Sequence, residues 1–481
     1  MGIAELVAGA LGRATASPLF AVGAAFIDLT PVWLKDYAIR TFGSSDKLVL
    51  LLGLGAGIAV AALALGLLAR RWLRWGLAGL AAFGAVGVVA ALTRPTAQIL
   101  DVVPTLVGVG SGMVALAVLH RLPQQASTDR RRLLLGGAGA VAVAAGSAVG
   151  GRFLLGRQDV SAARKAIRLP APADRALTVP PGAQVRVPGM PSFTTPNAAF
   201  YRVDTALTLP QVDPRDWTLR IHGMVKNPIE LSFDELLDRA LTERDITISC
   251  VSNEVGGTLA GNARWLGAPL AALLREAGVA SGADQILSRS SDGMTLSTPL
   301  DVVLDGRDAL LAVAMNGEAL PVEHGFPARL VVPGLYGYVS ATKWVVDLKV
   351  TRFATDPAYW TERGYAERAP IKTFSRIDVP KPFARVKAGR VAVAGTAWAQ
   401  HRGVDAVEWQ VDDGPWRTAR LAPVPGLDTW RQWVAEWNAT PGTHTLRVRA
   451  TDGTGTTQPE ERARPLPDGA TGWHSVVITI T

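Results

Sequence analysis

Cys250 is the only cysteine in this chain of 481 residues, and its neighbourhood could support chemistry. It ends a β-type run over residues 246–250 and opens a polar, glycine-bearing stretch over residues 251–257. A thiolate between a strand and a loop can ligate a soft or high-valent metal without a partner cysteine. The ordinary alternative is an unreactive cysteine that packs as a small apolar residue. The thiol is therefore a candidate metal ligand that needs support from other residues.

Two other functions are open for the same thiol. A thiol hydrolase would use Cys250 as the nucleophile and His324 as its base, and alkylating reagents would label Cys250 in metal-free protein. A non-catalytic, membrane-tethered interaction protein would bind a partner through its C-terminal region, and Cys250 would be dispensable. Metal content and the effect of replacing Cys250 distinguish both from a metal-dependent oxidoreductase.

The first part of the chain has the composition of a membrane region. Up to about residue 151, Leu, Ala, Val and Gly dominate, whereas Asp, Glu, Pro and Trp become common after it. A helix needs about 20 apolar residues to cross a bilayer core. Transmembrane helices are therefore predicted over residues 48–69, 72–92, 99–119 and 133–151. A fifth, weaker span or a re-entrant segment is expected over residues 3–29, where Arg13, Pro18 and Asp28 interrupt the pattern.

Basic residues in the short loops predict the orientation of these helices. Arg70, Arg71 and Arg74 join the first two spans, and arginines at 121 and 130–132 precede the last one. Short loops rich in Lys and Arg stay on the cytoplasmic side. The loops near residue 94 and over residues 30–47 are less basic or mixed. We therefore expect a multi-pass protein of the cytoplasmic membrane whose catalytic domain is extracytoplasmic.

The overall charge requires no nucleic-acid partner. Part of the net charge of +8 comes from the loops between the predicted spans. No basic stripe interleaved with stacking aromatic residues indicates binding to nucleic acid.

Residues 128–135 resemble a twin-arginine export signal inside the chain. The arginines at 130–132 precede leucines and then small apolar residues. Such signals accompany domains that are exported folded, commonly with a cofactor already loaded. The same arginines are equally explained as positive charge before an ordinary span. Both explanations place the C-terminal part outside the cytoplasm.

Changes of composition divide the chain after the membrane region (1–151) into three parts. Residues 152–192 are rich in Pro, Arg and Ala, which predicts an extended linker. Residues 193–369 mix strands and short helices in an α+β pattern, and no glycine fingerprint for a dinucleotide follows a strand. The expected strands cover residues 218–221, 246–250, 310–315, 330–332 and 345–350, and a helix covers residues 268–277. Ser232 and Glu235 carry the signature of a capping box at another helix start.

Residues 370–481 change to short alternating strands with frequent turns. The expected strands cover residues 391–393, 407–411, 443–449 and 476–480. Leu446 and Val448 occupy one face of the third strand, while Arg447 and Arg449 occupy the other. This spacing predicts an immunoglobulin-like β-sandwich behind the α+β domain.

Six short stretches carry a family resemblance by their order and spacing. They are Thr-Pro-Asn-Ala-Ala-Phe-Tyr-Arg at 195–202, Ile-Ser-Cys-Val-Ser-Asn-Glu at 248–254, Met-Asn-Gly at 315–317, His-Gly-Phe-Pro-Ala-Arg at 324–329, Val-Pro-Gly at 332–334 and Lys-Trp at 343–344. Together they resemble the sulfite oxidase family of molybdopterin enzymes over residues 190–481. The C-terminal sandwich is similar to the dimerisation domain of that family.

The resemblance implies a role for these residues. A cysteine at the position of Cys250 ligates molybdenum in this family, beside the dithiolene sulfurs of one pterin and oxo or water ligands. Thiolate donation stabilises high-valent molybdenum and leaves an oxygen site open for a two-electron transfer. The pterin carries an anionic phosphate, so its pocket requires cations and amide-like groups. The implied cofactor-binding residues are Asn197, Phe200, Tyr201, His324, Arg329, Ser340, Thr342 and Lys343.

Two positions depart from the sulfite-oxidising members of the family. Those members place a tyrosine two residues before the Met-Asn-Gly turn, where this chain has Val313. They also place an arginine one residue after the position of Arg202, where this chain has Val203. These groups bind anions and handle protons, so sulfite is not the predicted substrate. The Asn-x-x-Phe-Tyr pattern looks closer to the bacterial sulfoxide-reductase branch.

The resemblance implies a membrane-anchored molybdopterin oxidoreductase. It would transfer oxygen atoms while molybdenum cycles between its six- and four-valent states. Its partners would be a small-molecule substrate, a separate electron-transfer protein or quinone, and membrane lipid, and the sandwich would form a homodimer. Of the six histidines, only His120 lies near a predicted span, so we expect no haem within the helices.

Overall fold

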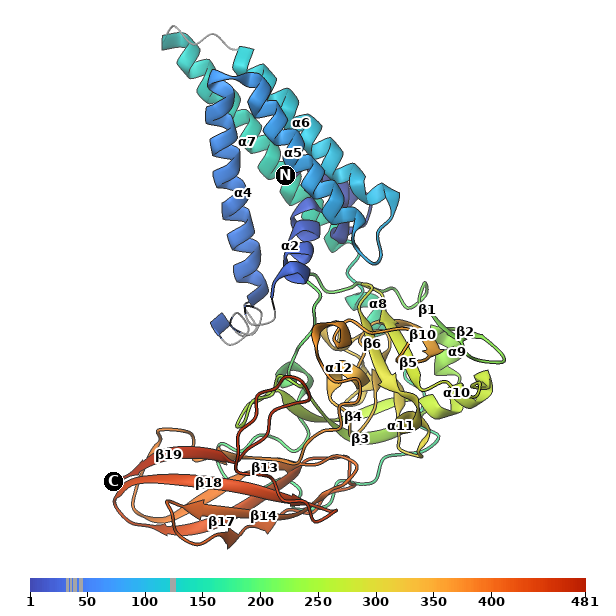
Figure 1. Cartoon of the computed structure of the whole chain (residues 1–481), viewed down its shortest axis with the longest axis vertical. Helices are drawn as coiled ribbons and strands as arrows, with labels where there is room; N and C mark the ends of the chain where they lie inside the picture. The colour runs from blue at the N-terminus through green and yellow to red at the C-terminus, as the bar shows by residue number, and fades with distance from the viewer. Residues whose placement is uncertain (32–33, 35–36, 38–40, 43–45, 122–126) are drawn as a thin grey trace. The chain divides into compact units, whose positions relative to one another are not determined.

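The computed structural model describes residues 1–31, 34, 37, 41–42, 46–121 and 127–481. The chain forms two compact units (Figure 1). The first contains residues Met1–Val160 and Thr205–Gln211, and the second contains Ser161–Asp204 and Val212–Thr481. The first unit is helical, and the second is built mainly from strands.

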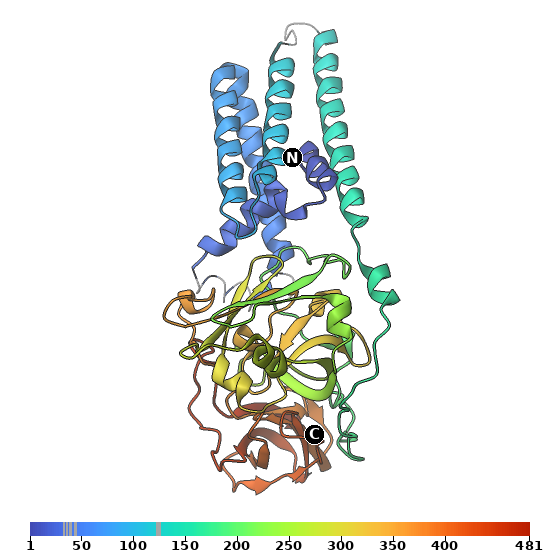
Figure 2. The ribbon, with the colours of Figure 1, turned by 90° about the vertical axis from the view of Figure 1, so that its right-hand side faces the viewer.

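Long helices make up most of the first unit (Figure 2). They are α4 (Asp46–Arg71), α5 (Leu73–Leu92), α6 (Val103–Arg121) and α7 (Ser127–Gly156). Among the described residues, four helices are long and apolar enough to cross a membrane, which agrees with the predicted runs.

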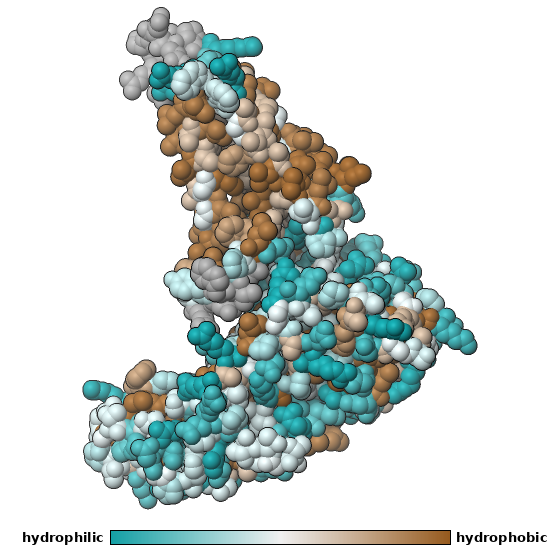
Figure 3. Space-filling model, in the orientation of Figure 1, coloured by the Kyte–Doolittle hydropathy of each residue, from teal (hydrophilic) through white to brown (hydrophobic). Residues whose placement is uncertain are grey.

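Apolar side chains cover the visible face of these helices in Figure 3. Leu52, Leu63 and Val141 are 64%, 66% and 69% exposed. Apolar surface of this extent is unfavourable in water and favourable in lipid. The surface therefore agrees with a membrane region.

The stretch over residues 3–29 does not form one continuous helix. It contains α1 (Gly2–Ala10) and α2 (Pro18–Leu29), which have 9 and 12 residues. Each is shorter than the roughly 20 residues that a crossing requires. Arg13 lies in the break, where its Nε is 2.6 Å from the buried carboxylate of Asp101. One continuous helical span over residues 3–29 is therefore wrong, and the re-entrant segment stays a prediction.

The loops that predict membrane orientation lie partly outside the described residues. This holds for residues 32–33, 35–36, 38–40, 43–45 and 122–126. The arginine-rich segment 128–135 lies within helix α7. Its export role and the sidedness of the membrane region stay predictions.

The α+β part of the second unit contains two sheets. The first has the order β3 (Thr242–Ser249), β4 (Ala260–Pro269), β7 (Leu310–Met315) and β8 (Glu318–Ala319), and β9 (Arg329–Val331) also pairs with β7. The second has the order β2 (Ile229–Ser232), β1 (Thr218–Gly223), β10 (Val345–Thr351), β5 (Gln285–Ser290) and β6 (Thr295–Pro299). Leu219 and Ile221 of β1 share one buried core with Leu311 of β7.

The predicted capping box at Ser232 and the predicted helix before Gly278 are both confirmed. Ser232 and Glu235 form both hydrogen bonds of the capping box that begins α9 (Phe233–Leu237). Helix α10 (Leu270–Ala277) ends at Gly278, whose φ of +69° suits a residue without a side chain. Two shorter helices, α11 (Leu300–Leu304) and α12 (Gly337–Ser340), follow along the chain.

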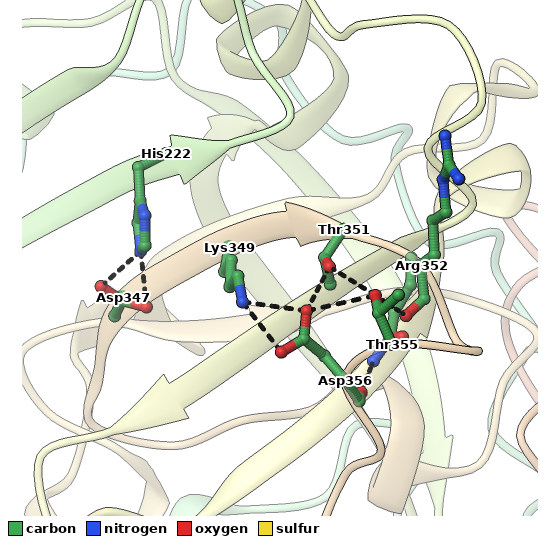
Figure 4. A network of polar contacts seen from close by, with 8 residues as sticks. His222, Asp347, Lys349, Thr351, Arg352, Thr355 and Asp356 are labelled. Carbon is green, nitrogen blue, oxygen red and sulfur yellow. Dashed lines mark hydrogen bonds and ion pairs between the residues drawn. The ribbon is translucent and has the colours of Figure 1, made fainter.

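A polar network covers part of the second sheet (Figure 4). His222 Nε2 lies 3.1 Å from the carboxylate of Asp347. Lys349 Nζ donates to Asp356 Oδ1 at 2.8 Å, and the hydroxyl of Thr351 donates to the same carboxylate. The first contact joins β1 to β10, and the other two fasten the segment after β10 to that strand, so the network stabilises the fold.

The segment 152–192, which its composition predicts as an extended linker, begins with helix and then packs within the second unit. Helix α7 continues to Gly156, and α8 (Ser161–Ala166) follows. Further along, Ala173 N donates to Leu241 O at 2.8 Å, and Val185 N donates to Gln432 Oε1 at 2.7 Å. Proline-rich backbone can be extended and still pack on a domain when its remaining amides find partners.

The C-terminal part consists of two mainly antiparallel sheets around one core. One has the order β11 (Phe374–Val379), β13 (Gly389–Trp398), β17 (Arg431–Ala439) and β16 (Arg420–Leu421). The other has the order β12 (Arg385–Val386), β19 (His474–Ile480), β18 (Gly442–Asp452), β14 (Val404–Val411) and β15 (Arg417–Thr418). Leu446 and Val448 are fully buried between them, as their alternation predicts. The immunoglobulin-like assignment stays a prediction.

His474 makes the stability of this part sensitive to acid. Burial lowers the pKa of His474 to about 4, with Arg462 and Arg376 acting in the same direction. Its Nδ1 accepts a hydrogen bond from Ile377 N at 2.9 Å, which requires the neutral ring. The unfolded chain binds the proton more readily, so this contribution is complete above pH 6.5 and is lost as the pH falls toward 4.

We expect acidification from pH 7 to pH 4 to lower the free energy of unfolding by up to about 3 kcal/mol through this residue. Thermal unfolding of detergent-solubilised protein, followed by tryptophan fluorescence, measures the change. His474→Gln retains an acceptor and cannot be protonated, so its melting temperature should fall less steeply over this pH range. Equal slopes for both proteins would contradict the assignment.

Candidate active site

Cys250 lies where strand β3 gives way to the loop that leads to β4. The register of the two strands pairs Ser249 with Ala260, so the intervening residues form a closed loop. Cys250 N donates to Leu259 O at 2.9 Å, and Leu259 N donates to Asn253 Oδ1 at 2.8 Å. The thiol is free and 8% exposed. Both ends of the loop are therefore anchored beside the sulfur.

Burial and nearby polar groups have opposite effects on the pKa of the Cys250 thiol. Burial raises the pKa of the Cys250 thiol, while the amide and hydroxyl of Ser252 and the charge of Lys343 lower it. The raised pKa keeps the unliganded thiol protonated at neutral pH. A metal cation would compensate for burial and favour the thiolate.

Aromatic rings form one wall of the site. Phe200 is buried and stacks on Tyr201 with ring centroids 5.2 Å apart. The ring of Phe200 rests on Gly261 of β4, where a Cβ atom would come within 2.6 Å of it. Burial raises the pKa of Tyr201, and the nearby Cys250 sulfur adds to this effect. Tyr201 is therefore a neutral phenol close to the sulfur.

His324 belongs to a second wall and is held by backbone. Its Nε2 donates to Asn197 O at 3.0 Å, and the side chain is 3% exposed. Asn197 is fixed in turn, because its Oδ1 accepts from Asn316 Nδ2 at 2.7 Å. Burial lowers the pKa of His324 to about 4, and the charges of Arg329 and Lys343 add to this effect. His324 is therefore neutral at physiological pH.

Arg329 is a buried cation with neutral partners. Its Nη1 donates to His324 O at 3.1 Å, and its Nη2 donates to Ala341 O at 3.3 Å. The guanidinium also lies 5.1 Å from the ring centroid of Trp265. Burial lowers the pKa of Arg329 to about 10, so it stays charged at neutral pH. Among the described residues, no carboxylate pairs with it within 4.0 Å.

Lys343 and its neighbours supply the third wall. Lys343 Nζ donates to Asp204 Oδ2 at 2.8 Å and to Glu323 O at 3.1 Å. Burial lowers the pKa of Lys343 to about 8, which Asp204 partly opposes. The hydroxyls of Ser340 and Thr342 are buried and engaged, with Tyr336 O at 2.9 Å and Ser288 Oγ at 2.6 Å respectively.

Of the predicted residues, Tyr201 and Lys343 interact electrostatically with Cys250. Arg329 interacts in the same way with Tyr201, and His324 with Lys343.

The structure also adds residues that sequence reasoning missed. Ser252 and Asn253 lie two and three residues after the cysteine, so their polarity could have signalled them. Asp204 and Tyr336 gave no such signal. Asp204 becomes relevant only through its contact with Lys343, and Tyr336 only because the charge of Cys250 contributes to the raised pKa of its buried phenol.

The two departures from the sulfite-oxidising pattern have different surroundings. Val313 is fully buried in the core of the α+β part. Arg202 pairs with Asp204 at 2.8 Å, and Val203 is 46% exposed. Neither valine can bind an anion through its side chain.

Two unmet interactions fit an anionic, hydrogen-bonding cofactor. Asn253 Nδ2 is buried and has no acceptor among the residues that the structure describes. The buried guanidinium of Arg329 requires negative charge that its carbonyl partners do not provide. A pterin phosphate would meet the second requirement, and the hydrogen-bonding edges of the pterin would meet the first. The donor set therefore fits molybdenum–molybdopterin.

Comparisons with known proteins identify the domain that carries this site. The family described as "Oxidoreductase molybdopterin binding domain" matches residues 206–360. Mitochondrial sulfite oxidase from Drosophila melanogaster is 31% identical over 327 residues, which are 56% of this chain and 56% of that protein. The oxidoreductase YuiH from Bacillus subtilis is 32% identical over 196 residues, which are 41% of this chain and 90% of that protein.

A solved structure agrees with these relatives. The sulfane dehydrogenase SoxCD from Paracoccus pantotrophus aligns with a TM-score of 0.50 and 27% identity, covering 55% of this chain and 74% of that one. The fold and the site therefore define an oxidoreductase domain of the molybdopterin class. The chain belongs to the sulfite oxidase family of molybdopterin-dependent oxidoreductases.

Proposed function

We propose that the chain is a membrane-anchored enzyme that transfers an oxygen atom between a small molecule and molybdenum ligated by Cys250. The observation that carries the proposal is the free thiol of Cys250 on an anchored loop, where the charge of Lys343 acts on it, together with the buried guanidinium of Arg329, which has no carboxylate partner among the described residues. A thiol that only packed in a core would not need this cationic surrounding.

Each wall would perform a different task around the bound cofactor. Arg329 and Lys343 would hold the pterin phosphate by charge, and Phe200 would offer an aromatic face to the pterin. Tyr201, whose pKa is raised, would donate a hydrogen bond near the sulfur. His324 would keep its position through Asn197 O rather than exchange protons. The cofactor itself supplies two-electron oxygen-atom chemistry.

A neutral S-oxide or N-oxide is the substrate class that we favour over sulfite. The valines at 203 and 313 supply no charge or proton to an anionic substrate. Reduction of a sulfoxide consumes two electrons and two protons and yields a thioether and water. A separate protein or a quinone would deliver the electrons singly, and the helices of the first unit would anchor the enzyme in the membrane. Oxidation of a thioether is the same reaction in reverse.

Metal and pterin analysis of the full-length chain tests this proposal. Protein from a host that makes molybdopterin should contain about one molybdenum and about one pterin per chain. A redox dye then reports turnover with sulfoxides, N-oxides and sulfite, assayed separately. Metal-free protein that retains activity would overturn the proposal, and turnover of sulfite alone would overturn the choice of substrate.

The thiol hydrolase finds less support than the oxidoreductase. His324 Nε2 is engaged with Asn197 O, and no hydrogen bond joins its ring to the sulfur among the described residues. A Cys–His pair requires such a contact to activate the thiol. A non-catalytic role predicts metal-free protein, which the same analysis detects.

A further inference from the structure

The C-terminal sandwich contacts the loop that follows Cys250. Arg376 lies on strand β11, and its Nη1 donates to Gly257 O at 2.8 Å. Gly257 ends the glycine-bearing stretch, and its own amide donates to Glu254 O at 2.8 Å. The side chain of Arg376 therefore crosses from the sandwich to the far end of the loop.

The sandwich fixes the direction of Arg376. Its Nε donates to Asp378 Oδ1 at 3.0 Å, and Asp378 Oδ2 accepts from Thr396 Oγ1 at 2.6 Å. The guanidinium lies 5.5 Å and 5.7 Å from the ring centroids of Trp398 and Trp430. Arg376 is 5% exposed. A buried arginine with a paired carboxylate and two aromatic neighbours has little freedom to turn away from the loop.

A second residue of the sandwich supports the same loop. Gly256 approaches His474 so closely that a Cβ atom on it would lie 2.4 Å from Nε2. Its φ of +80° also favours glycine at this position. The ring of His474 is held by the bond from Ile377 N. The backbone at Gly256 therefore follows the surface of the sandwich.

The sandwich also holds the strand before Cys250. Gln400 Nε2 donates to Thr247 O at 2.9 Å, and Trp430 N donates to Thr247 Oγ1 at 2.7 Å. Thr247 N donates to Asp428 O at 2.8 Å. Thr247 and Gln400 are fully buried. Contacts from one sandwich thus bracket the cysteine on both sides.

We infer that Arg376 is a positioning residue for the cysteine loop, so the sandwich completes the active site in addition to any role in dimerisation. The inference rests on the proposed ligation of molybdenum by Cys250. A metal ligand must be held in one orientation, and residues outside the ligand set commonly fix it. The loop's own hydrogen bonds fix its two ends, and Arg376 adds a contact from the sandwich at Gly257, within a stretch where glycines leave the backbone more freedom.

Arg376→Gln and Arg376→Lys test the inference in the full-length, cofactor-loaded protein. Glutamine should lose the bond to Gly257 O, whereas lysine retains a charged donor and should rescue part of the loss. We expect kcat to fall about 10- to 100-fold for glutamine and less for lysine, with little change in KM. Molybdenum content should stay near that of the parent, while the thiolate-to-metal absorption shifts and amide exchange over residues 251–259 accelerates.

Arg431→Gln is the matched control. Arg431 is also a sandwich arginine, and its side chain donates to Ala422 O and Val404 O at 2.8 Å without reaching the loop. The Arg431→Gln substitution should leave kcat, the thiolate-to-metal absorption and the amide exchange of residues 251–259 unchanged. The inference is overturned if both Arg376 variants match the parent in kcat and loop exchange, or if exchange accelerates across the sandwich as much as in the loop.

Cys250→Ser separates this inference from the function on which it depends. If the serine variant keeps the parent's absorption and activity, ligation by Cys250 is wrong. If the serine variant is inactive and both Arg376 variants are normal, only the positioning role is wrong.

Discussion

Cys250→Ser should abolish turnover while the fold persists. A serine hydroxyl stays protonated at neutral pH and is a harder, weaker donor than a thiolate, so high-valent molybdenum loses the ligand that stabilises it. We expect kcat to fall at least about 1,000-fold, equivalent to about 4 kcal/mol of transition-state stabilisation. Dye-linked kinetics measure the fall, and the thiolate-to-metal absorption should disappear from the spectrum.

Stability and thiol chemistry provide the controls for this variant. Serine is close in size to cysteine, so the melting temperature of metal-free protein should change little. In the loaded parent, the metal should protect the sulfur from iodoacetamide, and in metal-free protein the buried thiol should react slowly. Rapid alkylation of metal-free protein that removes a hydrolytic activity would instead support the thiol hydrolase. A serine variant with normal turnover would exclude both functions of the sulfur.

Arg329→Met should reduce the cofactor content sharply without weakening the empty protein. The guanidinium is buried against carbonyl oxygens and an indole ring. Removing a buried charge that no carboxylate of the described residues balances is commonly neutral or stabilising for the fold, whereas an anionic ligand depends on that charge. We expect pterin and molybdenum per chain to fall about 10- to 100-fold. Metal analysis and fluorescence of the oxidised pterin measure the loss.

Arg244→Met is the contrasting control. Arg244 Nε donates to Asp308 Oδ2 at 2.7 Å, and the same guanidinium also pairs with Asp174. Its replacement leaves carboxylates without a partner, so it should lower the melting temperature and leave cofactor content unchanged. A loss of cofactor content in Arg329→Met alone, and a lower melting temperature in Arg244→Met alone, would separate cofactor binding from the stability of the fold. Normal cofactor content in Arg329→Met would contradict the role of Arg329.

Local chemistry predicted much of the fold. The run at 218–221, the capping box at Ser232 and the stop at Gly278 each depend on neighbours within a few residues, and each is present. The apolar runs predicted the long helices for the same reason, since a helix satisfies its own backbone. The structure of residues 3–29 was harder to predict, because the break between its helices contains Arg13, which pairs with Asp101 far away in the sequence.

The candidate site was predictable as a set of residues and not as a set of contacts. Cys250, His324 and Arg329 were identified from short stretches in order and spacing. That Asp204 pairs with Lys343 depends on segments about 140 residues apart. No local pattern specifies such a pairing, because packing of the sheets decides it.

The sequence by itself determined the membrane-like first region, the strand that leads to Cys250 and the family of the catalytic domain. These properties reside in composition, in hydrophobic period and in residues that are adjacent along the chain. Only the tertiary structure decided that Arg329 is a buried cation with no carboxylate partner in the described part of the chain and that Arg376 of the sandwich reaches Gly257 O. Charge balance and hydrogen bonding between distant segments arise when the chain is packed, so they have no signature in the order of residues.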